Sequence, residues 1–185
     1  MKIVSTVLDE VVADTLRRGG VVVVRTDTIY GLLARADDEQ AVERVYQLKG
    51  RDPEKSPIVL ISNIDQLYDA LPPEAEVVVR EHWPGRVSII LPSANAPQWI
   101  RRHNQSVAYR MPDHPELRRL IEKTGPLIAP SANPEASPPA SDTRAALEYF
   151  GDAVDIYVDG GQVDDNTPPS RLLRVHHDGT FDQLR

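Results

Sequence analysis

The chain has 185 residues, 41% of them hydrophobic, and its 21 lysines and arginines against 28 acidic residues give a net charge of −7. An acidic protein is not built as a general nucleic-acid binder, because contacts with phosphates supply nearly all non-specific affinity for nucleic acids. The absence of cysteine excludes disulfides, thiolate nucleophiles and zinc sites that require sulfur, so any chemistry has to use oxygen and nitrogen side chains.

The length fits one compact domain spanning residues 1–185. No apolar run approaches the roughly 20 residues that cross a bilayer, and the start at Met1 lacks the apolar stretch of a secretory signal. We therefore expect no membrane association and a cytoplasmic location. The histidines show no helical ligand spacing, and the adjacent His176 and His177 point to opposite faces if they lie on a strand. We therefore expect no transition-metal site.

Apolar periodicity predicts alternating helices and strands without an internal repeat. The first helix is expected at Leu8 to Arg18, and the run Val21 to Val24 predicts a strand covered on both faces. Next come a helix at Gln40 to Leu48, a strand at Pro57 to Ser62, a short helix near Asp65 to Leu71, a helix at Glu74 to His82 and a strand at Arg86 to Leu91. The remaining elements are a strand at Ser106 to Arg110, a helix at Pro115 to Lys123, a strand at Leu127 to Ala129, a helix at Thr143 to Phe150 and strands at Val154 to Val158 and Ser170 to Val175. This alternation favours an open α/β sheet in which some neighbours joined by short loops are antiparallel.

Polar clusters at the ends of these elements are the candidates for chemistry, because neither a GxxxxGK[ST] nor a GxGxxG phosphate-binding motif is present. The first cluster, Arg25 to Leu32, follows the valine strand. Hydroxyls of Thr26, Thr28 and Tyr30 can orient a small polar ligand, and Asp27 can accept from an ammonium or hydroxyl group. A hydrogen-bonded turn explains the same residues.

The second cluster, Lys49 to Pro57, contains the three cations Lys49, Arg51 and Lys55 in seven residues. Held by one glycine and two prolines, this segment can fold over a triphosphate, with arginine giving bidentate contacts and lysine a point charge. The alternative is a solvated loop that is partly neutralised by its own acidic residues.

The third and fourth candidates lie on or after short apolar strands. Ser131 and Asn133 can bind a phosphate and a base or ribose edge. A simple turn stabilised by the serine or asparagine side chain explains the same residues. A second Pro-Ser-Ala-Asn, at residues 92–95, is interpreted as a turn that ends a strand. Arg110 ends an apolar strand, so its charge requires a partner if buried, either a substrate carboxylate or an internal acidic residue.

Taken together and in this order, the clusters resemble the YrdC/TsaC family of threonylcarbamoyl-AMP synthases in its single-domain form. The matching segments are Thr-Asp-Thr-x-Tyr-Gly-Leu at 26–32, Lys-x-Arg at 49–51, Trp-Pro-Gly at 83–85, Val-Ala-x-Arg at 107–110 and Ser-x-Asn at 131–133. Positions that differ from the family's usual pattern are Arg25, Arg86 to Ser88, Pro134 to Ala136 and Arg171. The resemblance implies a twisted, open, mixed parallel and antiparallel sheet with flanking helices and a concave basic cavity.

The resemblance also implies the reaction and the residues that perform it. The family makes threonylcarbamoyl-AMP and pyrophosphate from L-threonine, bicarbonate and ATP, with Mg²⁺ accompanying the ATP, for the modification of tRNA. The residues implied to bind the nucleotide are Lys49, Arg51, Lys55, Ser131, Asn133 and Ser170, of which Lys49 and Arg51 are the catalytic pair. The residues implied to bind threonine are Thr28, Tyr30 and Arg110. Downstream tRNA threonylcarbamoyl transferase proteins would receive the product.

Two other hypotheses remain open at this stage. One is a module that binds double-stranded RNA or tRNA through the same concave basic patch without catalysis. The other is a paralogue that keeps the adenylation chemistry but takes its carbamoyl group from another donor.

Overall fold

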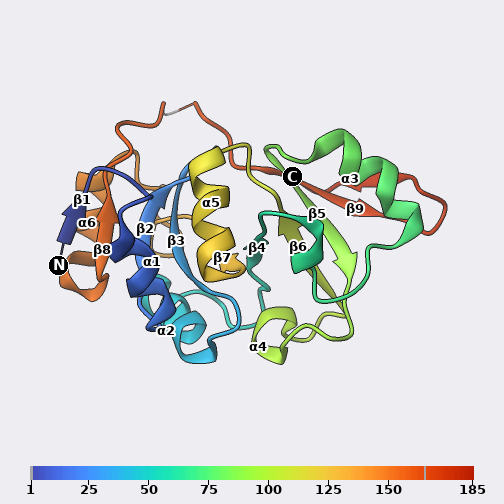
Figure 1. Ribbon diagram of the computed structural model, residues 1–185, viewed down its shortest axis with the longest axis horizontal. Helices are drawn as coiled ribbons and strands as arrows, with labels where there is room; N and C mark the ends of the chain where they lie inside the picture. The colour runs from blue at the N-terminus through green and yellow to red at the C-terminus, as the bar shows by residue number, and fades with distance from the viewer. Residues whose placement is uncertain (1, 165) are drawn as a thin grey trace.

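The structure is a computed structural model that describes residues 2–164 and 166–185. Within these residues ten strands form one sheet (Figure 1). The strands are β1 (Lys2–Val4), β2 (Val22–Arg25), β3 (Tyr30–Arg35), β4 (Ile58–Leu60), β5 (Val87–Pro92), β6 (Ser106–Arg110), β7 (Leu127–Ile128), β8 (Ile156–Val158), β9 (Arg171–Val175) and β10 (Phe181–Gln183). The α-helices are α1 (Glu10–Arg17), α2 (Glu39–Lys49), α3 (Glu76–His82), α4 (Gln98–Arg101), α5 (Pro115–Thr124) and α6 (Thr143–Phe150).

The sheet is open and mixed, as the sequence predicts. Its strand order is β1-β8-β2-β3-β7-β4-β6-β5-β9-β10. The pairs β1–β8, β2–β8, β4–β6 and β5–β9 are parallel, whereas β2–β3, β3–β7, β4–β7, β5–β6 and β9–β10 are antiparallel. The two central strands, β7 and β4, have only two and three residues. The segments that follow them therefore leave the sheet close to its centre.

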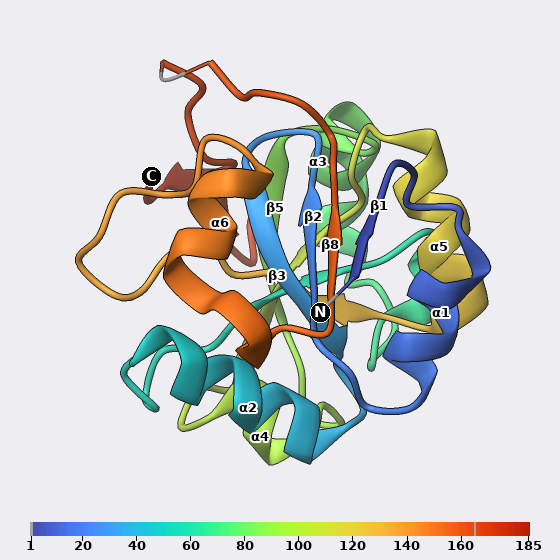
Figure 2. The ribbon, with the colours of Figure 1, turned by 90° about the vertical axis from the view of Figure 1, so that its left-hand side faces the viewer.

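Helices cover both faces of the sheet (Figure 2). On one face α1 and α5 bury Leu16 and Leu117 against β2 and β3 residues that include Val22. On the other face α2 and α6 bury Val45 and Phe150 in the larger of the two cores. Because both faces are covered, the first three residues of β2, Val22 to Val24, are apolar and buried whichever face they point to.

Short polar signals start and stop the helices. The side chain of Asp38 accepts a hydrogen bond from the Ala41 amide at 3.0 Å and starts α2, and Asp9 and Asp142 do the same for α1 and α6. Gly50 ends α2 in the left-handed conformation with φ 59°, which glycine adopts without a Cβ clash. The chain therefore turns sharply after Lys49, and the cationic segment leaves the helix axis.

Most predicted elements are confirmed, and the exceptions have local causes. The helix expected near Asp65 to Leu71 is wrong, because only a 3₁₀ turn at Ile64–Gln66 forms and Leu67 is already extended. The strand β3 was not predicted, because its apolar residues directly follow the polar segment that was interpreted as a ligand-binding turn. The short elements β1, α4 and β10 were also not predicted, since three or four residues carry no periodicity.

We predict that Leu32→Ala lowers the free energy of unfolding by about 2–5 kcal/mol, because Leu32 is fully buried on β3 and its truncation leaves a cavity. Urea denaturation measures this difference. The control is Val77→Ala on α3, where the side chain is 66% exposed and the change should stay within about 0.5 kcal/mol. Equal effects of the two substitutions would contradict the assignment of β3 to the core.

Candidate functional site

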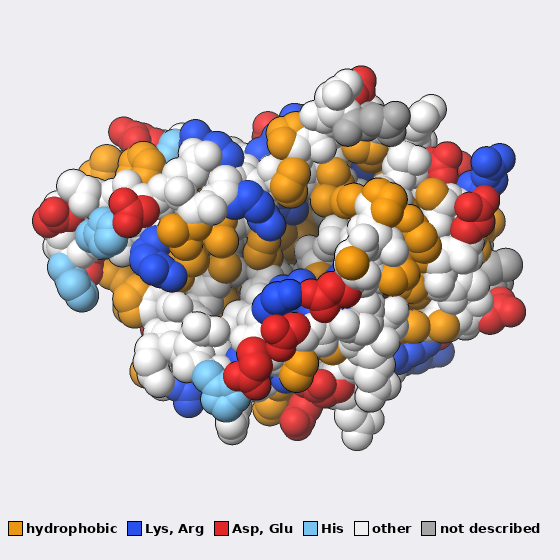
Figure 3. Space-filling model, turned by 180° about the vertical axis from the view of Figure 1, so that it is seen from behind, with side chains coloured by type: hydrophobic (Ala, Val, Ile, Leu, Met, Phe, Trp, Pro, Cys, Tyr) orange, Lys and Arg blue, Asp and Glu red, His pale blue; other side chains and the backbone are white. Residues whose placement is uncertain are grey.

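A pocket of about 250 Å³ opens where the chain leaves the middle of the sheet. The space-filling view shows a hollow near the centre of one face, with basic side chains around it (Figure 3). Distant segments contribute to the pocket: the turn between β2 and β3, the segment after α2, the end of β6, the segment after β7 and the segment before β9. Its lining residues are Thr26, Thr28, Ile29, Tyr30, Gly31, Arg51, Ile58, Arg110, Ala129, Pro130, Ser131, Pro139, Thr167, Pro169, Ser170 and Arg185.

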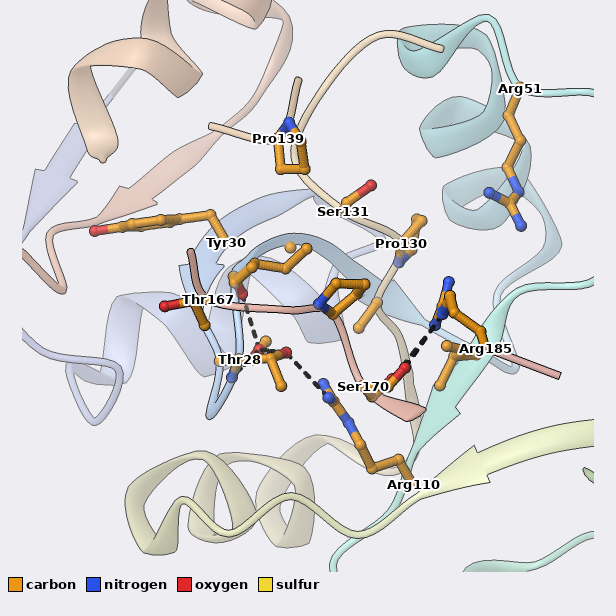
Figure 4. A pocket seen from close by; sticks show the side chains of 16 residues that line it. Thr28, Tyr30, Arg51, Arg110, Pro130, Ser131, Pro139, Thr167, Ser170 and Arg185 are labelled. Carbon is orange, nitrogen blue, oxygen red and sulfur yellow. Dashed lines mark hydrogen bonds between the residues drawn. The ribbon is translucent and has the colours of Figure 1, made fainter. Parts of the chain in front are cut away.

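The fold brings most of the predicted site residues to this one pocket (Figure 4). Those that line it are Thr28, Tyr30, Arg51, Arg110, Ser131 and Ser170. Lys49, Lys55 and Asn133 do not line it, although their segments do. In Figure 4 Thr28 and Arg110 lie together at one end, Arg51 lies on the opposite side, and Arg185 lies between them, next to Ser170. The pocket therefore has two chemically distinct ends.

At the first end, a chain of hydrogen bonds fixes the polarity of Thr28. The Thr26 hydroxyl donates to the Ile29 carbonyl at 2.8 Å, so the Thr28 hydroxyl has to donate to Thr26 Oγ1 across their 3.1 Å contact. Arg110 Nη1 donates to Thr28 Oγ1, also at 3.1 Å. The Thr28 hydroxyl thus uses its proton on Thr26 and one lone pair on Arg110. Its second lone pair remains, so Thr28 can accept a hydrogen bond from a ligand but cannot donate one.

Arg110 forms a buried ion pair with Asp27. The closest ion-pair atoms, Arg110 Nη2 and Asp27 Oδ1, are 3.5 Å apart, and the two side chains are only 4% and 2% exposed. The amide of Asp113 donates to Asp27 Oδ2 at 3.1 Å. Burial lowers the pKa of Arg110 and the Asp27 charge opposes that shift; a guanidinium stays charged in proteins. Of the two partners considered for Arg110 from the sequence, the internal acidic residue is present and is Asp27. Arg110 nevertheless lines the pocket.

Tyr30 contributes its ring to the wall, but its hydroxyl is bound elsewhere. The hydroxyl donates to the Gly161 carbonyl at 2.7 Å and accepts from the Gly160 amide at 3.0 Å. In Figure 4 the hydroxyl points away from the other labelled side chains. Tyr30 thereby anchors the start of the segment whose later residues Thr167 and Pro169 line the pocket.

Lys49 lies beneath the segment that follows β7. Its ammonium donates to the carbonyl oxygens of Ser131 at 2.5 Å and Asn133 at 2.6 Å, and the residue is only 4% exposed. Burial, followed by the like charge of Arg51, lowers the pKa of Lys49 to about 8. Lys49 of the Lys-x-Arg segment is therefore hydrogen-bonded to the backbone of the Ser-x-Asn segment, which joins the two segments.

The other two cations of this segment differ in their surroundings. Arg51 lines the pocket, donates to the Ser56 carbonyl at 3.1 Å and has its guanidinium 5.5 Å from the centre of the Tyr46 ring. Lys55 forms an ion pair with Glu135 and lies outside the pocket lining. Arg51 is therefore the cation of this segment that is available at the pocket surface.

Asn133 and Ser170 are both buried, and other protein groups use only part of their hydrogen-bonding capacity. The Asn133 amide group donates to the carbonyls of Pro134 and Ser137, each at 2.8 Å. Its Oδ1 atom is buried and has no hydrogen-bond partner among the described residues. The Ser170 hydroxyl, just before β9, lies 3.0 Å from the Ser88 hydroxyl on β5. A buried acceptor without a partner is a feature that needs explaining, and a ligand donor is one explanation.

Arg185 is a pocket residue that the sequence analysis missed. The antiparallel pairing of β10 with β9 returns the chain to Ser170, whose carbonyl accepts from Arg185 Nε at 3.2 Å. No local motif marks this residue, because only the strand pairing brings it to the site. The pocket lining thus contains three arginines, and no acidic residue is among its described members.

Among the described residues there is no group of three or more His, Asp or Glu side chains that could hold a metal ion. The acidic residue next to the pocket, Asp27, is already paired with Arg110.

The chain is similar to proteins of known family and structure. The family model for Sua5, YciO and YrdC proteins, described as "Telomere recombination", matches residues 14–185. The threonylcarbamoyl-AMP synthase of Marinobacter nauticus is 36% identical over 167 residues, which are 87% of this chain and 87% of that protein. The threonylcarbamoyl-AMP synthase of Pseudomonas aeruginosa is 36% identical over 174 residues, which are 91% of this chain and 93% of that protein.

The same relationship holds in three dimensions. The crystal structure of Pyrococcus abyssi Sua5 complexed with L-threonine superposes with a TM-score of 0.88 at 31% identity. The alignment covers 100% of this chain and 56% of that chain, so this chain spans little more than half the length of that Sua5. With the family model, the curated relatives and the superposition in agreement, this chain belongs to the Sua5/YciO/YrdC family.

Proposed function

We propose that this chain makes threonylcarbamoyl-AMP and pyrophosphate from L-threonine, bicarbonate and ATP. The observation that carries the proposal is the convergence of Thr28, Arg51, Arg110, Ser131 and Ser170 on one pocket from five separate segments. Relatives of similar length carry the name of this enzyme, and the superposed Sua5 was crystallised with L-threonine. In this proposal residues 1–185 act as one domain that contains the complete site.

Threonine binds at the end of the pocket where Arg110 and Thr28 lie. Arg110 offers its guanidinium to the carboxylate, which is the partner that a planar cation binds best. Thr28 Oγ1 offers an acceptor and therefore suits the amino or hydroxyl group of threonine. Tyr30 supports this end through its ring and through the Gly160–Gly161 turn that its hydroxyl holds.

ATP binds at the opposite end, between the segments after α2 and after β7. Arg51 contacts the phosphates from the pocket wall, and Lys55, on the same segment but outside the pocket lining, adds a second positive charge. Ser131 and Ser170 supply hydroxyls, and the unpartnered Oδ1 of Asn133 accepts from the nucleotide. Lys49 acts with Arg51 by adding positive charge and by holding the Ser131 and Asn133 carbonyls in place. The resulting pocket has a positive potential within an acidic protein.

The chemistry requires positioning and charge neutralisation more than a protein nucleophile. The threonine amine captures CO₂ derived from bicarbonate to give a carbamate. A carbamate oxygen then attacks the α-phosphorus of ATP, the bond to the β-phosphate oxygen breaks, and pyrophosphate leaves. Fixed arginine and lysine charges stabilise the negative charge that builds up on the phosphate oxygens. Mg²⁺ would enter with ATP and would supply further positive charge at the phosphates.

The product is an activated carbamoyl group, so a second step has to consume it. We propose that it passes to proteins that transfer the threonylcarbamoyl group to tRNA, with or without direct contact between this chain and the tRNA. No helix among the described residues is both long enough and apolar enough to cross a membrane. We place the reaction in the cytoplasm, where ATP and tRNA meet.

The proposed function makes three predictions, of which the first concerns the substrates. The purified chain should release pyrophosphate from ATP only when L-threonine and bicarbonate are both present, because the nucleophile is a carbamate formed from them. A coupled pyrophosphate assay measures the rate. Release that proceeds equally well without threonine would refute the proposed function.

The second prediction concerns Arg51. Arg51→Ala should lower kcat/KM for ATP more than tenfold, because a charge-assisted contact contributes about 1.5–3 kcal/mol. The matched control is Arg144→Ala on α6, where the side chain is 86% exposed and outside the pocket. If both substitutions have the same effect on the steady-state rate, Arg51 does not contact the phosphates.

The third prediction concerns Lys49. Its amine should titrate near pH 8, as followed by carbon-13 NMR of labelled lysine. ATP should raise this pKa, because negative phosphates favour the charged ammonium. A pKa above 10 in the free protein would contradict the burial of the Lys49 amine. A pKa that does not change when ATP is added would place Lys49 away from the nucleotide.

The same shift affects stability in a defined pH window. The unfolded chain keeps the Lys49 proton up to the usual pKa of 10.5, whereas the folded chain releases it near pH 8. The unfolded state therefore binds more protons between these pH values, and this group makes the fold more stable as pH rises through the window. Lys49→Met should remove this part of the pH dependence in urea denaturation.

A further inference from the structure

Two segments that carry the proposed phosphate-binding residues are joined at their backbones. Lys49 donates to carbonyl oxygens of Ser131 and Asn133, and the amide of Glu135 donates back to the Lys49 carbonyl at 2.6 Å. These contacts involve no carboxylate. The two segments are therefore held together whether or not the Glu135 side chain takes part.

The Glu135 carboxylate nevertheless lies among the cations of the segment after α2. Its Oε2 accepts from the Asp52 amide at 2.9 Å, and its Oε1 accepts from the Lys55 ammonium. These hydrogen bonds, Lys55 first, lower the pKa of the Glu135 carboxyl, and the charge of Arg51 contributes as well. An amide N–H and an ammonium converging on one anionic group form the kind of position that also binds a phosphate oxygen.

The carboxylate can leave this position at little cost. Glu135 and Lys55 have 40% and 54% of their side chains exposed, and ion pairs in water contribute little because solvent screens both charges. The backbone contacts with Lys49 remain when the carboxylate moves. Because both side chains are exposed, the exchange needs no opening of the core.

We propose that Glu135 is an internal competitor of the nucleotide: its carboxylate occupies an anion-binding position formed by Lys55 and the Asp52 amide, and a phosphate group of ATP displaces it. Both anions use the same donors, so only one can be bound at a time. Glu135 thereby weakens the binding of ATP and of other phosphate anions, and its removal strengthens it. The inference rests on the proposed function, because it requires the nucleotide phosphates to lie beside Arg51.

The test compares the ATP affinity of the wild-type chain and Glu135→Gln by isothermal titration calorimetry with Mg²⁺ present. Glutamine keeps the size of the side chain but loses the charge. The Kd for ATP should fall about two- to fivefold, the range expected when a solvent-screened ion pair no longer competes. The Kd for inorganic pyrophosphate should fall by a similar factor, and the gain should shrink at high salt.

The control is Glu148→Gln on α6, which makes the same change of net charge at a side chain that is 69% exposed and paired with Arg144. Its ATP affinity should match that of the wild type. In the background of Lys55→Ala, Glu135→Gln should give no gain, because the shared donor is gone. Thermal unfolding of each variant verifies that the fold is intact.

The outcomes separate the two claims. If wild-type ATP binding is measurable and Glu135→Gln binds ATP equally or more weakly, the carboxylate only supports the loop and the inference is overturned. If Glu148→Gln gives the same gain, the effect is one of net charge and the inference is again overturned. If no variant binds ATP at all, the proposed function fails instead.

Discussion

The buried ammonium of Lys49 is the contact on which the rest of the site depends. A charged group that is 4% exposed is costly to bury unless its protons are used, and the two carbonyl oxygens of Ser131 and Asn133 use them. This contact fastens the segment after β7 to the end of α2. As a consequence Arg51 and Ser131, 80 positions apart in the chain, face the same pocket. Removal of the whole Lys49 side chain would leave these two carbonyls without their donor and release the segment that forms one wall.

The pocket divides its charges between two tasks. At one end the Asp27–Arg110 pair fixes a guanidinium, and the hydroxyl chain through Thr28 fixes where protons lie. At the other end Arg51 presents positive charge, Arg185 adds to it from between the two ends, and no acidic residue is among the described lining residues. This arrangement suits a reaction in which an amino acid has to be oriented and a polyphosphate has to be neutralised, without covalent attachment to the protein. Exposed Glu135 moderates the second end without belonging to its wall.

Local signals predicted much of the fold, whereas long-range pairing decided the rest. The strand Ser106–Arg110 and the helix Thr143–Phe150 agree with the prediction to the residue, because alternation and an aspartate cap mark them. The convergence of Lys49 with Ser131 and Asn133 followed only from the family resemblance, since no local rule relates residues so far apart. Arg185 had no signal at all, because it reaches Ser170 through the β9–β10 pairing. The hydroxyl of Tyr30, predicted to face threonine, is bound by the Gly160–Gly161 turn, which the sequence could not reveal.

The central claim is that threonine and ATP bind together at opposite ends of this one pocket. A crystal structure of the chain with L-threonine and a non-hydrolysable ATP analogue tests it most directly. The account predicts the threonine carboxylate against Arg110, its amino group facing the analogue's α-phosphate, and the phosphates against Arg51. Ligands that bind on another surface, or threonine and nucleotide that lie too far apart to react, would contradict it.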